Sequence, residues 1–131
     1  MISVCMTTFN GEKFIFEQIN SILPQLDIND EIIISDDSSN DNTISIIENI
    51  NDIRIKLIKN NKFGNPIFNL ENAIKNAVGD YIFLCDQDDI WLPNKVSEFL
   101  KHLKKNDFVM SDAYLVDCEL KIISQTLDEW R

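Results

Sequence analysis

Three carboxylates, Asp86, Asp88 and Asp89, stand within four positions of one another directly after a short apolar run. That run, Tyr81–Cys85, is bounded by Gly79, and its length and composition predict a strand buried on both faces of a sheet. The carboxylates would then lie at the carboxyl end of the strand, where open α/β sheets bind ligands. Asp86 and Asp88 are two apart on an extended segment, so their side chains can share one ligand. Because such close negative charges repel one another, the cluster predicts a site for a hard divalent cation.

Two further polar segments also follow predicted strands. Residues 7–11 follow a strand over residues 1–6, and residues 36–41 follow a strand over residues 31–35. Loops after parallel strands share one edge of the sheet, so these segments should meet the acidic cluster there. The two segments and the acidic cluster together supply an aromatic ring that can stack on a base, carboxylates that can accept hydrogen bonds from base or ribose, and a binding site for a metal-bound pyrophosphate. This combination predicts a nucleotide site.

The apolar periodicity predicts four successive strand–helix units, and therefore an α/β fold with a doubly wound, mostly parallel sheet. The third strand alternates apolar and basic residues, which places it near the sheet edge. Four apolar residues of the third helix should face the sheet, and the last two strands should form a hairpin around residues 117–119. The predicted strands are residues 1–6, 31–35, 53–58, 81–85, 108–116 and 120–124. The first predicted helix ends at Leu23, the second covers residues 42–50, the third begins at Pro66, and the fourth covers residues 93–104. The four apolar residues of the third helix are Ile67, Leu70, Ile74 and Ala77.

The bulk composition is that of about one globular domain of 131 residues. The net charge of −10 argues against nonspecific binding to nucleic acid or to an anionic membrane, so no nucleic-acid partner is expected. No apolar run is long enough to span a bilayer, and the chain opens on a predicted strand rather than a secretion signal. Cys5, Cys85 and Cys118 lie in apolar runs without metal-site spacing, and we expect buried, reduced thiols of a cytoplasmic protein.

Three motifs in order resemble the family 2 glycosyltransferases, which have the GT-A fold. They are residues 3–10 (SVCMTTFN), residues 35–41 (SDDSSND), and residues 79–82 (GDYI) leading into residues 86–91 (DQDDIW). The resemblance covers residues 2–117, and Ser111-Asp112-Ala113 is a further, softer match. It implies a Rossmann-like, mostly parallel sheet with helices on both faces.

The resemblance also implies roles for individual residues in binding a nucleotide-sugar donor such as a UDP- or dTDP-sugar. Thr7 and Phe9 would line the base and ribose. Asp37 would accept a hydrogen bond from the base, with Asp36 beside it, and Asp86 would also lie at the nucleotide.

For the metal, the resemblance implies that Asp86 and Asp88 form the DxD-type pair, with Asp88 the direct ligand of Mn²⁺ or Mg²⁺. The cation would screen the charge that builds on the leaving nucleoside diphosphate. An acceptor hydroxyl would attack with inversion, helped by a carboxylate base. The acceptor would be a saccharide or lipid-linked saccharide, and the DQDDIW form is similar to members that assemble bacterial surface polysaccharide, including rhamnosyltransferase-like ones.

The chain departs from the family pattern at several positions. Thr7 stands where the family often has Pro, Phe9 where it has Tyr, and Ser38 where many relatives have Gly. A basic residue that meets phosphate in the family has no clear counterpart, and Lys62 or Lys59 could take its place.

The family's catalytic base lies well beyond the acidic motif, past Arg131. We therefore interpret residues 1–131 as the nucleotide-sugar-binding part of a longer enzyme. That enzyme would be cytoplasmic, and segments outside this chain could hold it at the inner face of the membrane.

Other interpretations remain open on the residues alone. Asp36 and Asp37 could be helix caps, and Phe9 could belong to the core. The only role of Asp89 could be to stabilise the N-terminus of the following helix with its negative charge. A noncatalytic nucleotide-sugar-binding module or an aspartyl phosphatase would also use an acidic loop. An EF-hand starting at Asp86 is excluded, because its glycine and glutamate positions hold other residues.

Overall fold

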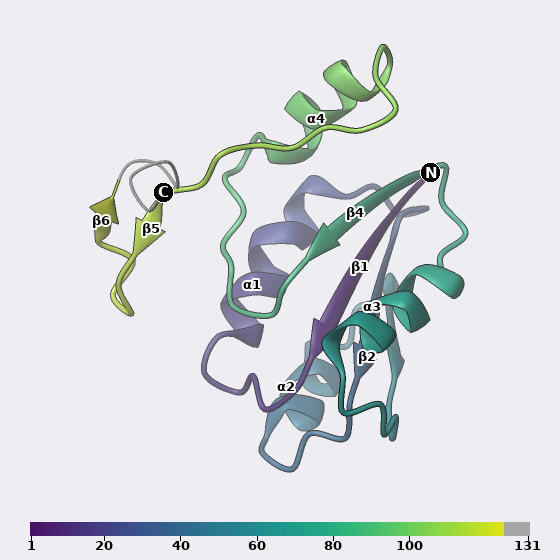
Figure 1. The fold of residues 1–131 in the computed structure, drawn as a ribbon, viewed down its shortest axis with the longest axis vertical. Coiled ribbons are helices and arrows are strands. Elements are labelled where there is room, and N and C mark those ends of the chain that lie inside the picture. The colour runs from purple at the N-terminus through teal and green to yellow at the C-terminus, as the bar shows by residue number, and fades with distance from the viewer. Residues whose placement is uncertain (125–131) are drawn as a thin grey trace. The chain divides into compact units, whose positions relative to one another are not determined.

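The structure is a computed structural model and describes residues 1–124 (Figure 1). The chain divides into two compact units, Met1–Val96 and Ser97–Arg131. The predicted domain of residues 1–131 thus extends past the described residues. Within them, no helix combines the length and apolar character needed to cross a membrane.

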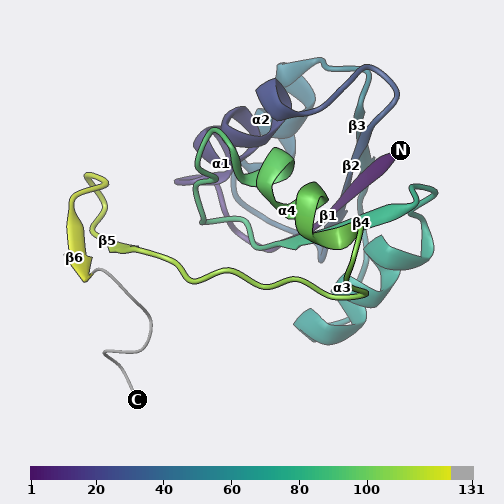
Figure 2. The same cartoon turned by 90° about the horizontal axis from the view of Figure 1, so that it is seen from above.

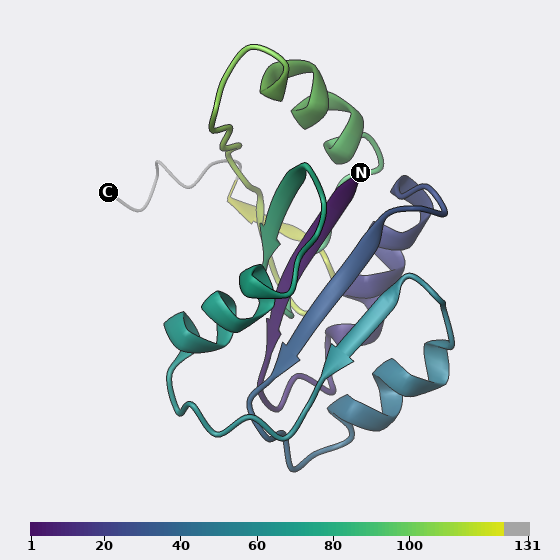
Figure 3. The same ribbon diagram turned by 90° about the vertical axis from the view of Figure 1, so that its right-hand side faces the viewer.

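The first unit is built on a four-stranded sheet in the order β3-β2-β1-β4 (Figure 3). Its strands are β1 (Ile2–Thr8), β2 (Glu31–Asp36), β3 (Ile55–Ile58) and β4 (Tyr81–Cys85), and all neighbours pair in parallel. The predicted α/β fold with a mostly parallel sheet is confirmed, as is the edge position of β3. The carboxyl ends of all four strands consequently lie at one edge of the sheet.

Helices cover both faces of this sheet, as expected (Figure 2). On one face lie α1 (Ile15–Ile22), the short helix η1 (Leu23–Gln25) and α2 (Thr43–Ile50), and on the other lies α3 (Pro66–Lys75). The α3 side of the core contains Cys5, Ile33 and Ala73. Because strand residues are buried under helices on both faces, the sheet forms a rigid support for its loops.

The prediction that β4 is buried on both faces is wrong. Phe83 and Cys85 are buried, whereas Ile82 and Leu84 are 40% and 51% exposed. β4 is the last strand of the sheet, and α3 packs against β1 and β2. One face of β4 is therefore left without a covering helix in the described unit.

The orientation predicted for α3 is also partly wrong. Ile67 is 72% exposed and Ile74 is exposed, while Asn69 and Ala73 are buried against the sheet. Asn69 is drawn inward because its side-chain amide bonds to Ser35 of β2, donating to the carbonyl at 2.9 Å and accepting from the hydroxyl at 2.7 Å. Leu70 and Ala77 of the predicted set do pack against the core, so polar pairing and apolar packing together decide which side of this helix faces it.

Beyond the first unit the chain continues α4 (Lys95–Leu103) and then forms β5 (Leu115–Val116) and β6 (Ile122–Ser124), which pair antiparallel. The predicted hairpin around residues 117–119 is confirmed. The predicted strand over residues 108–116 is wrong except at its end, because residues 108–114 find no strand partner within residues 1–124. Cys118 is exposed in the hairpin turn, contrary to the prediction of a buried thiol, whereas Cys5 and Cys85 are buried as expected.

Candidate functional site

A cleft of about 820 Å³ lies where the strands of the first unit end. The carboxyl ends of the strands, the loops that follow them and the start of α3 build it. Its lining residues are Thr7 and Thr8 at the end of β1, Phe9 after it, Asp37 and Ser38 after β2, Lys62, Gly64 and Asn65 after β3, Pro66 and Asn69 in α3, and Asp86, Gln87 and Asp88 after β4. Of the residues predicted for the site, Thr7, Phe9, Asp37, Asp86 and Asp88 are thus brought to one cleft.

Phe9 presents its ring at the cleft and is 56% exposed, so it is not a core residue. Its backbone is held from the acidic loop, because Gln87 accepts the Phe9 N–H at 3.0 Å and donates to the Phe9 carbonyl at 3.1 Å. Gly11 leaves room for this bridge, since a Cβ there would lie 2.2 Å from Gln87 Oε1. The loops after β1 and β4 are therefore joined through one side-chain amide.

Asp36 is fully buried and is not among the residues that line the cleft. Its carboxylate accepts from the Thr8 hydroxyl at 2.7 Å, the Ser39 N–H at 2.8 Å and the Ser39 hydroxyl at 2.6 Å. These contacts tie the end of β1 to the loop after β2. The structure thus gives Asp36 a place behind the cleft, from which it positions the loop that carries Asp37.

Asp37 lies at the cleft and holds the loop after β3. One carboxylate oxygen accepts the Phe63 N–H at 2.6 Å and the other accepts the Gly64 N–H at 2.8 Å. Gly64 has φ +57°, a backbone conformation that glycine adopts at no steric cost. Each carboxylate oxygen has a second lone pair, so Asp37 can still accept a hydrogen bond from a ligand.

The acidic loop concentrates negative charge at the cleft. Asp86 and Asp88 are exposed there, and partial burial together with their charges raises the pKa of Asp89. No group of three or more His, Cys, Asp or Glu side chains within residues 1–124 is arranged to hold a metal ion. Two carboxylates nevertheless fit Mg²⁺ or Mn²⁺, since Mg²⁺ in particular is commonly held by one or two carboxylates together with ligand phosphate oxygens.

Trp91 anchors the far end of the acidic loop. It is buried, its ring centroid lies 5.7 Å from that of Phe83, and its backbone N–H donates to the Ser21 hydroxyl at 3.0 Å. The ammonium of Lys95 lies 4.8 Å from the centre of the Trp91 ring. Trp91 is therefore a packing residue that fixes where the loop ends.

The sequence interpretation missed the roles of Gln87 and Asn69. Gln87 stands between two aspartates whose charges dominate the interpretation of that loop, and Asn69 lies beside the predicted apolar stripe of its helix rather than in it. No local signal in the sequence marks either residue as a bridge to a distant segment.

Comparison with known proteins agrees with this architecture. The family model for glycosyl transferase family 2 matches residues 3–130. The chain is 35% identical over 107 residues to the UDP-Glc:alpha-D-GlcNAc-diphosphoundecaprenol beta-1,3-glucosyltransferase WfgD of Escherichia coli, covering 82% of this chain and 42% of WfgD. It is 40% identical over 109 residues to the dTDP-rhamnosyl transferase RfbG of Shigella flexneri, covering 78% of this chain and 38% of RfbG.

Among solved structures, S. aureus TarS 1-349 in complex with UDP-GlcNAc matches with a TM-score of 0.72 and 25% identity, over 88% of this chain and 33% of that one. The fold is thus that of the GT-A glycosyltransferases. The chain spans less than half the length of each of these relatives. On the family match and the shared fold, the chain belongs to glycosyl transferase family 2.

Proposed function

We propose that the cleft binds the nucleoside-diphosphate part of a sugar donor, UDP- or dTDP-linked, and that the chain is the donor-binding part of a glycosyltransferase. The observation that carries this proposal is that Phe9, Asp37 and Asp88, distant in sequence, line one cleft. The names of the relatives support it, since WfgD is named for UDP-Glc and RfbG for dTDP-rhamnose, and TarS was crystallised with UDP-GlcNAc.

Within the cleft, Thr7 and Phe9 would receive the base and ribose. The exposed Phe9 ring offers a flat apolar face for stacking. Asp37 would accept from a base N–H with the lone pairs that Phe63 and Gly64 leave free. Asp36 acts from behind the cleft by positioning this loop.

In the acidic loop of the same cleft Asp88, with Asp86, would hold Mn²⁺ or Mg²⁺ together with oxygens of the diphosphate. A divalent cation there supplies Lewis-acid screening of the charge on the departing nucleoside diphosphate. The two carboxylates and the open cleft suit such a shared site.

The rest of the reaction concerns the longer protein of which this chain would be a part. Inverting transfer to an acceptor hydroxyl requires a general base, which we place C-terminal to Arg131. A lipid-linked saccharide is the acceptor class that the name of WfgD supports, in bacterial surface polysaccharide synthesis at the cytoplasmic face of the membrane.

Calorimetric titration of UDP and dTDP, with and without Mn²⁺, tests the donor site on the wild-type chain and on Asp88→Ala. We expect binding that strengthens at least tenfold with Mn²⁺ in the wild type and loses this dependence in Asp88→Ala. Binding that ignores Mn²⁺ and is unaffected by Asp88→Ala would reject the metal role. A folded chain that binds neither nucleotide under any condition would reject the donor site itself.

A further inference from the structure

A row of polar side chains on α1 and η1 is bonded to the backbone that follows β4. The row consists of Gln18, Ser21 and Gln25, which are three and four residues apart and therefore lie on one side of these helices. Its four backbone partners are the carbonyls of Asp86 and Leu92 and the N–H groups of Trp91 and Val96. The segment after β4 is thus held at its start, in its middle and at its end.

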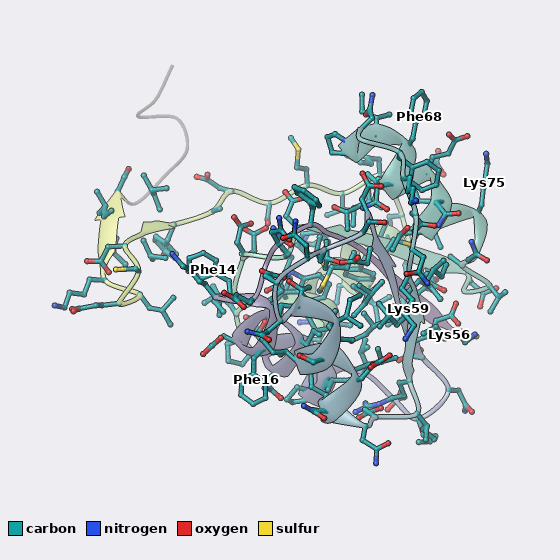
Figure 4. The ribbon with its side chains drawn as sticks, turned by 90° about the horizontal axis from the view of Figure 1, so that it is seen from below. Phe14, Phe16, Lys56, Lys59, Phe68 and Lys75 are labelled. Carbon is teal, nitrogen blue, oxygen red and sulfur yellow. The ribbon has the colours of Figure 1, made fainter. Side chains whose placement is uncertain are left out.

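Gln18 is the fully buried member of this row. The other buried residues of α1 are isoleucines, whereas Phe16 on the opposite side of the helix points outward and is 51% exposed (Figure 4). A methionine of similar length would also fill the position of Gln18. A buried amide, in contrast, costs free energy unless its polar atoms are bonded. What distinguishes Gln18 from its buried neighbours is therefore the bond that its amide makes.

That bond falls at the point where the sheet stops holding the chain. The pairing of β4 with β1 ends at Cys85, so Asp86 is the first residue beyond it. The Gln18 amide donates to the Asp86 carbonyl at 3.1 Å. This carbonyl belongs to the planar peptide that joins Asp86 to Gln87. Holding it therefore fixes the directions in which the side chains of Asp86 and Gln87 leave the backbone at the cleft.

We propose that Gln18 is a positioning residue for the metal site of the cleft. By holding the Asp86 carbonyl, it directs the carboxylates of the acidic loop toward one shared cation. Gln18 is not among the residues that line the cleft, so it acts through Asp86 rather than on the ligand. The inference rests on the proposed function, since Asp86 and Asp88 are the cation ligands proposed there.

Gln18→Met and Gln25→Met form a matched pair of variants. Each replaces a glutamine of the same row by an apolar side chain of similar length. Gln18 is bonded at the start of the segment, beside the proposed cation ligands, and Gln25 is bonded at its end. UDP is titrated by calorimetry into the wild-type chain and both variants over a series of Mn²⁺ concentrations. Uridine, which has no phosphate to share a cation, is titrated in parallel.

We expect Gln18→Met to raise the Mn²⁺ concentration that gives the half-maximal gain in UDP affinity by about tenfold, the scale on which residues behind a metal ligand act. Uridine affinity should stay within about twofold of the wild type in both variants. Gln25→Met should keep the wild-type response to Mn²⁺. Thermal unfolding checks that the chains are folded. Gln18→Asn keeps the amide but shortens the side chain by one methylene, and it should give the same shift if Gln18→Met does not fold.

The outcomes separate this inference from the donor site on which it rests. A wild-type chain that responds to Mn²⁺, with a Gln18 variant that responds at the same concentration, overturns the role of Gln18 and leaves the donor site standing. An equal loss of UDP and uridine affinity, or the same shift in Gln25→Met, would show a general effect on structure and also overturn it. UDP binding by the wild type that ignores Mn²⁺ overturns the proposed metal site and this inference together.

Discussion

Gln87 holds both backbone groups of Phe9 with one side chain, accepting the N–H at 3.0 Å and donating to the carbonyl at 3.1 Å. Phe9 follows β1 and Gln87 follows β4, and the two strands are direct neighbours in the sheet. The aromatic ring of Phe9 and the carboxylates beside Gln87 are therefore held in a fixed relation.

Gln87→Ala should weaken UDP binding in Mn²⁺ by about tenfold without removing any atom proposed to touch the nucleotide. Loss of two hydrogen bonds frees Phe9 from the acidic loop, and each such bond contributes about 1 kcal/mol. Calorimetry measures the affinity. Gln25→Ala is the control, because Gln25 also bridges to the segment after β4, donating to the Leu92 carbonyl at 3.0 Å, but does not line the cleft.

Gly11→Ala gives an independent check of the same bridge. Its Cβ would lie 2.2 Å from Gln87 Oε1, so the amide must leave Phe9. The variant should lose affinity as Gln87→Ala does, and adding it to Gln87→Ala should cost little more. Fully additive losses in this double-mutant cycle would mean that the bridge does not couple the two loops.

Asn69→Ala and Ile67→Ala test which side of α3 faces the sheet. Asn69 is buried, and its removal takes the acceptor from the Ser35 hydroxyl and a donor from the Ser35 carbonyl, so the free energy of unfolding should fall by about 1–3 kcal/mol. Ile67 is 72% exposed, and its truncation should change stability by less than about 0.5 kcal/mol. Denaturant unfolding of both variants measures this. A larger loss in Ile67→Ala than in Asn69→Ala would restore the orientation that the apolar stripe predicts.

The ion pair between Asp52 and Arg54 should make part of the free energy of unfolding depend on pH. The hydrogen-bonded Arg54 guanidinium lowers the pKa of Asp52 to about 2, and the guanidinium also donates to the Leu23 and Leu26 carbonyls. An unfolded aspartate has a pKa of about 3.9, so this contribution is complete above that pH and is lost as the pH falls toward 2.

Asp52→Asn should therefore lower the free energy of unfolding by about 2 kcal/mol at pH 7, with a difference from wild type that shrinks between pH 4 and pH 2. Urea unfolding of the two proteins across this range measures the difference. A gap that stays constant with pH would show that Asp52 contributes through its shape rather than its charge.

The sequence was sufficient for the parallel α/β sheet, for the edge position of its third strand, and for the meeting of the acidic, aromatic and hydroxyl-bearing loops. Those inferences depend on a period of apolar residues and on the rule that parallel strands end at one edge. The orientation of α3 was not accessible in the same way. It is decided by the fit of Asn69 to Ser35, a residue 34 positions away, which no local pattern encodes.

Strand pairing explains the other differences. Residues 81–85 and 108–116 have similar apolar character, yet only the first lies beside a formed strand of the sheet. A strand requires a partner for its backbone hydrogen bonds, and composition does not reveal where that partner is. Likewise Asp36 and Asp37 are adjacent acids that the sequence does not distinguish. Asp36 ends the strand β2 and is buried, whereas Asp37 lies in the loop after it and lines the cleft.

The two backbone N–H groups that donate to the Asp37 carboxylate have a consequence for ligand binding. A nucleotide filling the cleft would displace water, and a bare carboxylate would lose much of its hydration at that moment. Here the Phe63 and Gly64 amide dipoles already stand in for part of that solvent. The acid is thus preorganised for a dry environment, and less of the attraction between it and a base would be lost to dehydration.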